Sequence, residues 1–397
     1  MSRNEPVPSF HPPRRLLMGP GPSDVHPRVL AAMAQPTIGH LDPAFIAMMD
    51  EVKGLLQAVF RTANALTLPV SGPGSAGMEA CFVNLLEPGD TAIVCVNGVF
   101  GGRMKENVER CGATAVVVAD AWGAPVDPAK VETALAAHPG ARLLAFVHAE
   151  TSTGVRSDAA ELCRLARAHG VLTVVDTVTS LGGIPVLVDE WGADAVYAGS
   201  QKCLSCVPGL SPVTFGPRAV ERIQGRKTRN QSWFLDFGLL TGYWTGGAKR
   251  AYHHTAPVNA LYALHESLVL LLEEGVEAAW ERHARMHRAL AAGLEAMGLA
   301  LPVAAEWRLP QLNAVAVPAG VDEAGVRARL LERWNLEIGA GLGALAGKVW
   351  RIGLMGQSAT PTHVATCLAA LEAVLADLGA PVARGEAVAA AEAVLFA

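Results

Sequence analysis

The feature that most constrains the fold is a regular alternation of short apolar runs and amphipathic segments between residues 65 and 215. Continuous apolar runs are typical of strands buried on both faces, and their alternation with helices favours a mainly parallel sheet covered on both sides. The runs expected to form strands are Leu66–Val70, Ala92–Val96, Ala115–Val118, Leu143–Val147, Leu172–Val175, Ala195–Tyr197 and Pro212–Phe215. The expected intervening helices are Gly77–Leu86, Arg103–Cys111, Pro128–Ala137 and Ala159–His169. The sequence therefore predicts a doubly wound α/β domain.

Beyond Pro257 the pattern changes to long helices with few strands. The expected helices are Val258–Glu274, Val276–Met297, Asp322–Trp334 and Thr360–Leu378, and the expected strands are Ala314–Val317 and Val349–Ile352. A chain of 397 residues also exceeds the size at which one hydrophobic core keeps growing. We expect an extended arm over residues 1–15, a large domain over 16–275 and a smaller C-terminal α/β domain over 276–397.

Composition excludes several classes of partner. Hydrophobic residues make up 51% of the chain and charged residues 17%, which fits a well-buried globular enzyme. The net charge of -5 offers no basic field for nucleic acid or an anionic membrane surface, and no apolar stretch approaches the roughly 20 residues of a membrane span. The N-terminus lacks the apolar run of a secretory signal, and the seven scattered cysteines fit reduced thiols. We expect a cytoplasmic protein that acts on small molecules.

A glycine-rich loop follows the first expected strand. Ligands bind outside the carboxyl ends of parallel strands, and there the chain reads Ser71-Gly72-Pro73-Gly74-Ser75-Ala76-Gly77. Glycines let backbone N–H groups approach an anion, and a following helix adds its dipole, so the loop could form a phosphate cup. The same residues match G-x-G-x-x-G, which keeps an NAD-dependent oxidoreductase open, although no Asp or Glu for a ribose follows the next strand. A tight turn that binds nothing is a third possibility.

Two charged residues follow later strands. Asp176 ends the run Leu172–Val175, and Lys202 lies in a small-residue loop after Ala195–Tyr197. An Asp at a strand end more often caps a turn, and most lysines are solvated, but this lysine follows a buried strand, where we expect a desolvated amine with a lowered pKa. A phosphate cup, a carboxylate and an amine on one sheet edge are what pyridoxal phosphate requires. The amine would bind the cofactor, and the carboxylate would keep the pyridine nitrogen protonated.

At these residues the chain resembles the class V (fold-type I) aminotransferases, and within them the alanine–glyoxylate and serine–glyoxylate (serine–pyruvate) group. The resemblance runs from Gly19-Pro20-Gly21-Pro22 to about Gly379. The motifs that carry it are Ser200-Gln201-Lys202, Val175-Asp176, Ser180-Leu181-Gly182-Gly183, His148 to Gly154, Tyr252-His253-His254-Thr255 and Gly347-Lys348-Val349-Trp350-Arg351-Ile352-Gly353.

The resemblance implies a role for each matching residue. Lys202 would hold pyridoxal 5'-phosphate as a Schiff base and carry the proton, and Asp176 would partner the pyridine nitrogen. Gly74, Ser75 and Gln201 would contact the phosphate, Thr151 would lie near the phenolic oxygen, and Arg351 would grip the substrate carboxylate. Phe100 would stack on the pyridine ring, at a position where the animal alanine–glyoxylate enzymes carry Trp. Tyr252 and Thr255 would reach the neighbouring subunit's cofactor, which implies a homodimer with shared active sites.

The expected reaction is ping-pong transfer of the amino group of L-alanine or L-serine to glyoxylate or pyruvate. Ureidoglycine–glyoxylate or kynurenine transamination is the alternative within the family, a Cys-dependent desulfurase is disfavoured, and a non-catalytic binding module is a further class. No metal is expected. Cys203-Leu204-Ser205-Cys206 lacks a second pair of ligands, and the charged neighbours of His283 and His287 indicate a solvated helix face.

Overall fold

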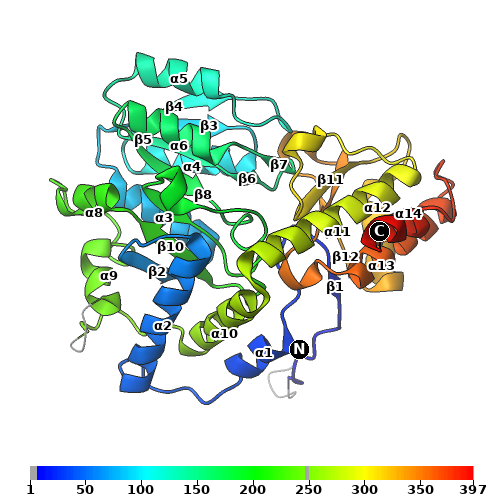
Figure 1. Cartoon of the computed structure of the whole chain (residues 1–397), viewed down its shortest axis with the longest axis horizontal. Coiled ribbons are helices and arrows are strands. Elements are labelled where there is room, and N and C mark those ends of the chain that lie inside the picture. Colours follow the sequence, from blue (N-terminus) through cyan, green and yellow to red (C-terminus); the bar gives the residue numbers. More distant parts are fainter. Residues whose placement is uncertain (1–6, 246–249, 397) are drawn as a thin grey trace.

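The computed structural model describes residues 7–245 and 250–396 and has a seven-stranded central sheet. In spatial order its strands are β2 (Leu66–Ser71), β10 (Leu210–Phe215), β9 (Ala195–Tyr197), β8 (Leu172–Asp176), β5 (Leu143–Val147), β3 (Thr91–Val96) and β4 (Thr114–Ala119). All neighbours are parallel except β10, which runs antiparallel to both β2 and β9. The mainly parallel, doubly wound sheet predicted from the apolar runs is confirmed (Figure 1).

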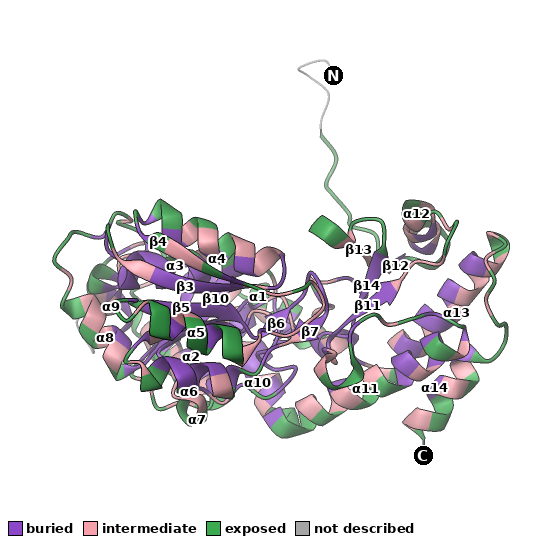
Figure 2. Ribbon diagram, turned by 90° about the horizontal axis from the view of Figure 1, so that it is seen from above, coloured by how far each residue is buried: buried purple, intermediate pink, exposed green. Residues whose placement is uncertain are grey.

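Helices cover both faces of this sheet. Figure 2 shows the buried strands between α3 and α4 on one side and α5 and α6 on the other. Between residues 27 and 274 the helices are α1 (Pro27–Met33), α2 (Pro43–Phe60), α3 (Gly74–Leu85), α4 (Val99–Arg110), α5 (Pro128–Ala137), α6 (Ala159–Ala168), α7 (Val188–Trp191), α8 (Pro217–Gln224), α9 (Phe237–Trp244) and α10 (Val258–Glu274). A small hairpin of β6 (Ala149–Glu150) and β7 (Val155–Arg156) follows β5.

Two helices begin about one turn earlier than the sequence predicts. The expected starts were Gly77 and Arg103, whereas α3 begins at Gly74 and α4 at Val99. Glycines at these positions lower helix propensity, but they allow close packing on the sheet. A Cβ on Gly77 would lie 2.0 Å from the Ser211 hydroxyl oxygen. Tertiary packing therefore outweighs local propensity, and it moves the first residues of both helices to the carboxyl edge of the sheet.

The C-terminal part forms a second layer of helices on a small sheet. Its strands β11 (Leu312–Ala316), β14 (Val349–Gly353) and β13 (Gly339–Ala340) pair antiparallel, and β12 (Leu336–Glu337) pairs with β1 (Leu16–Leu17). Its helices are α11 (Val276–Ala296), α12 (Glu323–Trp334), α13 (Pro361–Asp377) and α14 (Ala387–Leu395), with 3-10 turns at Ala305–Trp307, Gly343–Leu345 and Gly356–Ser358. The sequence did not predict α14, whose Ala387 and Ala391 are buried in this unit's core.

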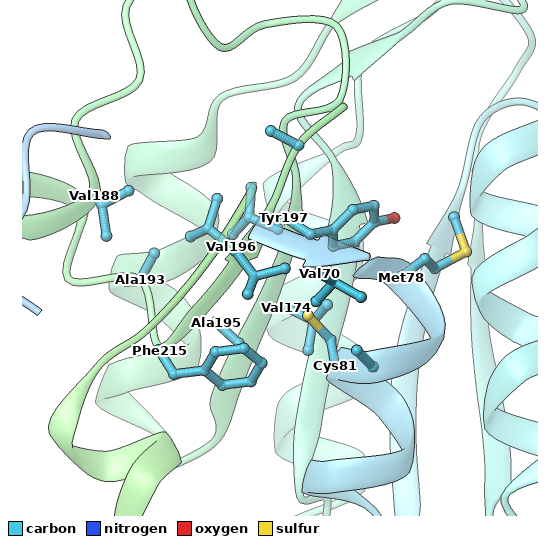
Figure 3. Packing of buried hydrophobic residues seen from close by; sticks show 14 of the residues in the cluster. Val70, Met78, Cys81, Val174, Val188, Ala193, Ala195, Val196, Tyr197 and Phe215 are labelled. Carbon is cyan, nitrogen blue, oxygen red and sulfur yellow. The ribbon is translucent and has the colours of Figure 1, made fainter. Parts of the chain in front are cut away.

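Two hydrophobic clusters correspond to these two parts. Figure 3 shows side chains of the larger cluster, where residues of β9 and β10 pack against α3. That cluster includes Ala279, whereas Met286 belongs to the second cluster, so the two cores part within α11. Met18 also belongs to the second cluster. The boundary near Gly275 stays a prediction, and the structure adds that residues 16–18 pack with the C-terminal core.

The histidine pair on α11 differs from the expectation. His283 is fully buried, where its Nδ1 lies 2.6 Å from the Ala279 carbonyl oxygen and its Nε2 accepts from the Gly356 amide at 2.9 Å. Its expected place on a solvated face is therefore wrong, because α11 packs against the loop at Gly356. His287 is partly buried and contacts Asn313. No group of three or more potential ligands that could hold a metal ion occurs in residues 7–245 and 250–396.

All seven cysteines are free and buried. Burial raises the pKa of the Cys203 and Cys206 thiols to about 12. Neither is a reactive thiolate at neutral pH, which argues against thiol chemistry at the C-x-x-C. In the part of the chain that the structure describes, no helix has the length and apolar character needed to cross a membrane.

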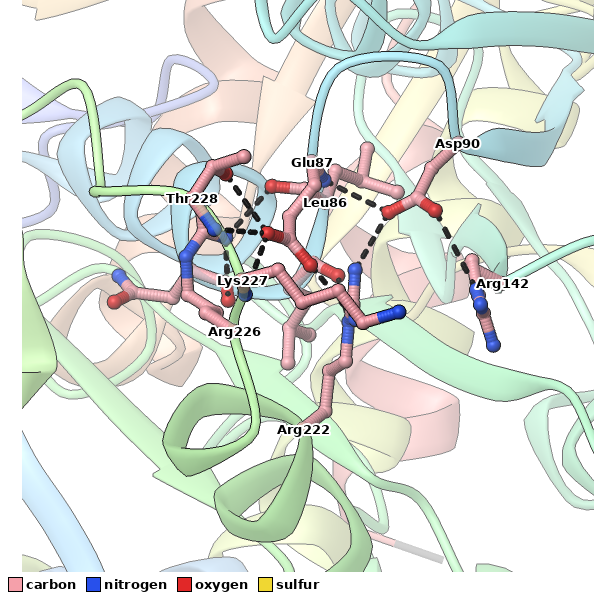
Figure 4. A network of polar contacts seen from close by, with 10 residues as sticks. Leu86, Glu87, Asp90, Arg142, Arg222, Arg226, Lys227 and Thr228 are labelled. Carbon is pink, nitrogen blue, oxygen red and sulfur yellow. Dashed lines mark hydrogen bonds and ion pairs between the residues drawn. The ribbon is translucent and has the colours of Figure 1, made fainter.

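A buried carboxylate joins the end of α3 to the segment after α8 (Figure 4). Glu87 accepts hydrogen bonds from the Lys227 amide at 2.8 Å and from the Thr228 amide and hydroxyl at 2.6 and 2.8 Å. Arg222 bridges Glu87 and Asp90 at 3.0 and 2.6 Å. Burial alone would raise the pKa of Glu87, but the hydrogen bonds from Thr228 and Lys227 and the charge of Arg222 lower it to about 2.

Glu87→Gln is expected to lower the free energy of unfolding by about 2–3 kcal/mol at neutral pH, the usual loss for hydrogen bonds to a charged group. Because the folded pKa lies below the ordinary 4.5, the contribution of Glu87 is present above 4.5 and is lost as the pH falls towards 2. Urea unfolding over this range, with exposed Glu332→Gln as the control, would test this. An equal difference at neutral pH and at about pH 2 would contradict it.

Candidate active site

A cavity of about 190 Å³ opens at the carboxyl ends of β8, β9 and β5. Seven of the residues singled out in the sequence line it: Gly74, Ser75, Phe100, Thr151, Asp176, Gln201 and Lys202. The other lining residues are Pro73, Met78, Arg103, Val147, Ala149, Val178, Thr179 and Tyr197. Parallel strands end at the same edge of a sheet, so residues up to 129 positions apart converge here.

Asp176 lies at the buried base of this cavity. Its Oδ2 accepts from the Tyr197 hydroxyl at 2.7 Å and its Oδ1 from the Val178 amide at 2.8 Å. Asp176 and Tyr197 are paired in register on β8 and β9, which places both side chains on the same face. Burial raises the pKa of Asp176 to about 7, against the lowering effect of the two hydrogen bonds. An unpaired charge here is costly, so the carboxylate is suited to a cationic partner.

Lys202 projects from the loop after β9. Its Nζ donates to the carbonyl oxygen of Pro20, in the Gly19-Pro20-Gly21-Pro22 loop. Gly21 approaches so closely that a Cβ there would lie 2.4 Å from Nζ. Burial, and then the charge of Arg351, lowers the pKa of Lys202 to about 8. The amine therefore loses its proton far more readily than an ordinary lysine.

The lowered pKa of Lys202 predicts how the apoprotein takes up an aldehyde cofactor. Only the neutral amine is a nucleophile, so the uptake rate is expected to rise with pH and to level off above about 8. A stopped-flow record of the visible absorbance on mixing apoprotein with pyridoxal phosphate would measure this. An ordinary lysine would show the rise near 10.5, and that outcome would contradict the prediction.

The start of α3 forms one wall of the cavity. Pro73 is its N-cap residue and no side chain caps the helix, so the amides of Gly74 and Ser75 can face an anion. A Cβ on Gly74 would lie 3.0 Å from a Val178 methyl carbon, so this wall packs closely on the loop after β8. The side-chain oxygen of Gln201 is buried and has no hydrogen-bond partner among the described residues. The open amides at the start of α3 suit a phosphate, and the unpartnered oxygen of Gln201 suits a polar group beside it.

Phe100 and Thr151 lie on neighbouring segments. Phe100 is in the first turn of α4, and the guanidinium of Arg103, one turn on, lies 4.8 Å from the centre of its ring. Thr151 follows β6, whose last residue, Glu150, has a fully buried side chain that contacts the start of α4. Both expected cofactor residues are therefore at the cavity, and the structure adds Arg103 at its mouth.

Arg351 is on β14 of the C-terminal unit and is mostly buried. Its Nε donates to the Ala340 carbonyl at 2.6 Å and one terminal nitrogen donates to the Thr151 carbonyl at 3.3 Å. Burial lowers its pKa to about 10, against the raising effect of Glu150. Arg351 thus adjoins the cavity from the opposite unit, next to Thr151, and remains a cation at neutral pH.

Tyr252 and Thr255 lie elsewhere. Both are exposed, Tyr252 by 64%, and neither lines this cavity. His254, between them, contacts the Ser71 hydroxyl at 2.8 Å, so the segment adjoins the end of β2, just before the loop that leads into α3. Their expected contact with a neighbouring subunit's cofactor stays a prediction.

Sequence reasoning missed four parts of the site: Tyr197, Glu150, Arg103 and the Pro20 carbonyl. Tyr197 was visible only as the last residue of an apolar run, and the strand pairing that brings it to Asp176 has no local signal. Glu150 is an acid in the stretch His148 to Gly154, but its partners Phe100 and Gly101 are about 50 positions away. A backbone carbonyl has no sequence signature at all.

The strands on either side of α3 bear on the alternative of an NAD-dependent oxidoreductase. A dinucleotide-binding unit needs adjacent parallel strands on either side of the glycine-rich turn. Here β2 and β3 flank the turn and α3, but β10, β9, β8 and β5 lie between them, and β2 pairs antiparallel with β10. The match to G-x-G-x-x-G is therefore not a dinucleotide-binding turn.

The residues fit pyridoxal phosphate. A buried carboxylate for a ring nitrogen, an amine of lowered pKa, open helix amides for a phosphate and an aromatic side chain border one small cavity. A cation for a substrate carboxylate adjoins it. Each group of the cofactor has a chemical counterpart among these side chains.

Comparisons with known proteins agree with this chemistry. The family model described as aminotransferase class-V matches residues 17–353. An alanine–glyoxylate aminotransferase of Callithrix jacchus is 42% identical over 365 residues, which cover 91% of this chain and 88% of that protein. The crystal structure of an alanine–glyoxylate aminotransferase from Nostoc sp. has a TM-score of 0.92 at 47% identity and covers 94% of this chain and 98% of its own. A ureidoglycine–glyoxylate aminotransferase from Bacillus subtilis has a TM-score of 0.95 at 38% identity, with 98% and 99% covered.

Proposed function

The chain belongs to the class V aminotransferases, which are pyridoxal-phosphate-dependent enzymes, and from this membership we propose that it transfers the amino group of L-alanine or L-serine to glyoxylate. The observation that carries the proposal is the convergence of Lys202 and Asp176 on one cavity bordered by the open start of α3. Alanine–glyoxylate relatives at 42% and 47% identity, aligned over nearly the whole chain, support the substrate pair.

When bound, pyridoxal phosphate supplies an aldehyde for amine exchange and a ring that accepts the electrons of a broken Cα–H bond. Asp176 would hold the proton on the ring nitrogen, because its carboxylate is buried and the hydrogen bonds that it accepts within the protein, from Val178 and Tyr197, leave it without a cationic partner. Tyr197 and Val178 orient the carboxylate. Lys202 moves the substrate proton at Nζ, which its lowered pKa allows near neutral pH.

Arg351 binds the substrate carboxylate. Two of its nitrogens are held by the carbonyls of Ala340 and Thr151, which fixes the guanidinium beside the cavity. Such a planar, forked donor matches a carboxylate in a way that lysine does not. Phe100 on the cavity wall and Arg351 beside the cavity narrow the space for the substrate, which favours amino acids with short side chains.

Transfer from ureidoglycine to glyoxylate is the second candidate. The Bacillus subtilis enzyme with that activity superposes over 98% of this chain, and Arg103 at the cavity mouth offers donors to a carbamoyl group. Half-reactions followed by cofactor absorbance, with alanine, serine, aspartate and ureidoglycine as donors, would decide between the two. Turnover with ureidoglycine alone would overturn the alanine or serine assignment.

A homodimer and a cytoplasmic location are part of the proposal. Trp233, Phe234 and Tyr252 are exposed near the Tyr252–Thr255 segment, and such apolar surface is typical of an interface. Seven free thiols are in keeping with a reducing compartment. Light scattering of the holoenzyme would test the dimer, and a monomeric mass with full activity would refute shared active sites.

A further inference from the structure

The buried carboxylate of Glu150 accepts hydrogen bonds that have no part in the proposed function described above. Its Oε2 accepts from the Phe100 amide at 3.1 Å and the Gly101 amide at 3.4 Å. Its Oε1 accepts from the Ser152 amide at 3.0 Å and the Ser152 hydroxyl at 2.6 Å. The same hydroxyl accepts from the Val99 amide at 3.0 Å. The first three amides of α4 are therefore all bound by residues about 50 positions away.

Distant residues bind these amides because the N-cap residue of α4 does not. That residue is Gly98, which has no side chain, and no local cap hydrogen bond is made. A Cβ on Gly98 would lie 2.4 Å from the Glu150 carboxyl carbon and 2.5 Å from the Ser152 hydroxyl oxygen. Glycine thus leaves the space in which Glu150 and Ser152 replace the missing cap. A carboxylate at this end of a helix is also favoured by the helix dipole.

The contacts reach two walls of the cavity at once. On one side Glu150 holds the turn that presents Phe100, and Arg103 follows one turn later. On the other side Thr151 lies between Glu150 and Ser152, and its carbonyl accepts from Arg351. The three residues 150–152 thus connect the aromatic side chain on one wall to the cation on the other.

We propose that Glu150 is a positioning residue of the active site, which sets the ring of Phe100 against the cofactor through the start of α4. The proposal rests on the proposed function for the cofactor but not for the substrate. It requires a side chain with two acceptor oxygens. Both oxygens accept from N–H groups, so an amide at this position must turn its own NH₂ towards one of those donors.

Glu150→Gln provides the test, with Glu332→Gln as an exposed control that makes the same chemical change. We expect the visible circular dichroism of the bound cofactor to change and kcat to fall by about 10- to 100-fold, the usual result of a misplaced catalytic group. The KM for the amino donor is expected to stay within about twofold, because Ala340 still holds Arg351. The Glu332→Gln enzyme should match the wild type in all three.

A double variant distinguishes positioning from stability. If Glu150 acts through Phe100, adding Glu150→Gln to Phe100→Leu lowers kcat little further, whereas independent effects multiply. Unchanged kcat and dichroism per folded molecule, with only a lower melting temperature, would show a merely structural role and overturn the proposal. If Glu150→Gln does not fold, Ser152→Ala replaces it and is expected to shift the dichroism in the same direction, and a wild-type spectrum there would overturn it.

The wild-type protein separates this proposal from the proposed function. A wild type that binds no pyridoxal phosphate contradicts the proposed function itself. A wild type that binds the cofactor and shows a normal spectrum, beside a Glu150→Gln enzyme identical to it, contradicts only the role of Glu150.

Discussion

Replacing Lys202 with alanine is expected to lower kcat by about 10³- to 10⁴-fold, the usual contribution of a positioned proton carrier at the upper end of its range. The amine at Nζ is the group in the cavity with both the lowered pKa and the reach to move a proton at a bound substrate. The fold should persist, because the loop is also held through its backbone: the Ser23 hydroxyl donates to the Lys202 carbonyl oxygen at 2.8 Å, a hydrogen bond that does not involve the lysine side chain.

Two measurements check this prediction. Single-turnover kinetics with alanine give the loss of kcat, and the visible spectrum of the purified variant should be that of free cofactor. Added methylamine should restore part of the activity, since a small primary amine can occupy the space of the lost side chain. Exposed Lys348→Ala is the control, and a Lys202→Ala enzyme within about tenfold of the wild type would contradict the assignment.

The second large effect concerns Asp176→Asn. The change keeps the shape of the side chain but removes the charge that holds a proton on the ring nitrogen, so kcat is expected to fall by about 10²- to 10³-fold. Stability should move the other way in the apoprotein. Burial raises the folded pKa of Asp176 from 3.8 to about 7, so the wild type loses stability as the pH rises through this range and the carboxylate must ionise. Above about pH 7 the asparagine variant should therefore be at least as stable as the wild type.

Asp194→Asn is the matched control for Asp176→Asn. Asp194 is also buried at the central sheet, where it accepts from the Thr173 amide at 2.9 Å and contacts Arg218 at 3.3 Å. It lies outside the cavity, so its variant should keep the kcat of the folded enzyme. Calorimetry of both apoproteins and kinetics of both holoenzymes would give the comparison. A less stable Asp176→Asn apoprotein with full activity would contradict the catalytic role of Asp176.

The central sheet was predictable because its strands are buried on both faces. The runs Leu143–Val147 and Ala195–Tyr197 match β5 and β9 at both ends, and the remaining five runs lie within the observed strands. Helix starts were harder. The glycines that lower helix propensity at the start of α3 and α4 are tolerated because they bring both helices close to the sheet, and that gain exists only after the sheet has formed.

The site, like the fold, has parts that the sequence predicts and parts that only the tertiary structure defines. Lys202, Asp176, Gly74 and Ser75 follow strands in the sequence, and the rule that parallel strands end at one edge was enough to bring them together. Asp176 was recognised without Tyr197, because the bond between them depends on the pairing of β8 with β9. The assignments of Phe100, Thr151, Gln201 and Arg351 came from the family resemblance, and the structure places all four at or beside the cavity.

The sequence by itself determined the layered α/β fold and the residues able to bind a pyridoxal-type cofactor, since apolar periodicity and strand ends are local properties of the chain. Tertiary structure alone decided the protonation of Asp176, through its burial, whereas the buried strand before Lys202 already pointed to a lowered pKa for that amine. It also decided the support behind them, where Glu150 caps a helix 50 positions away. Burial and long-range hydrogen bonds depend on which segments meet in space, and no single segment of the chain contains that information.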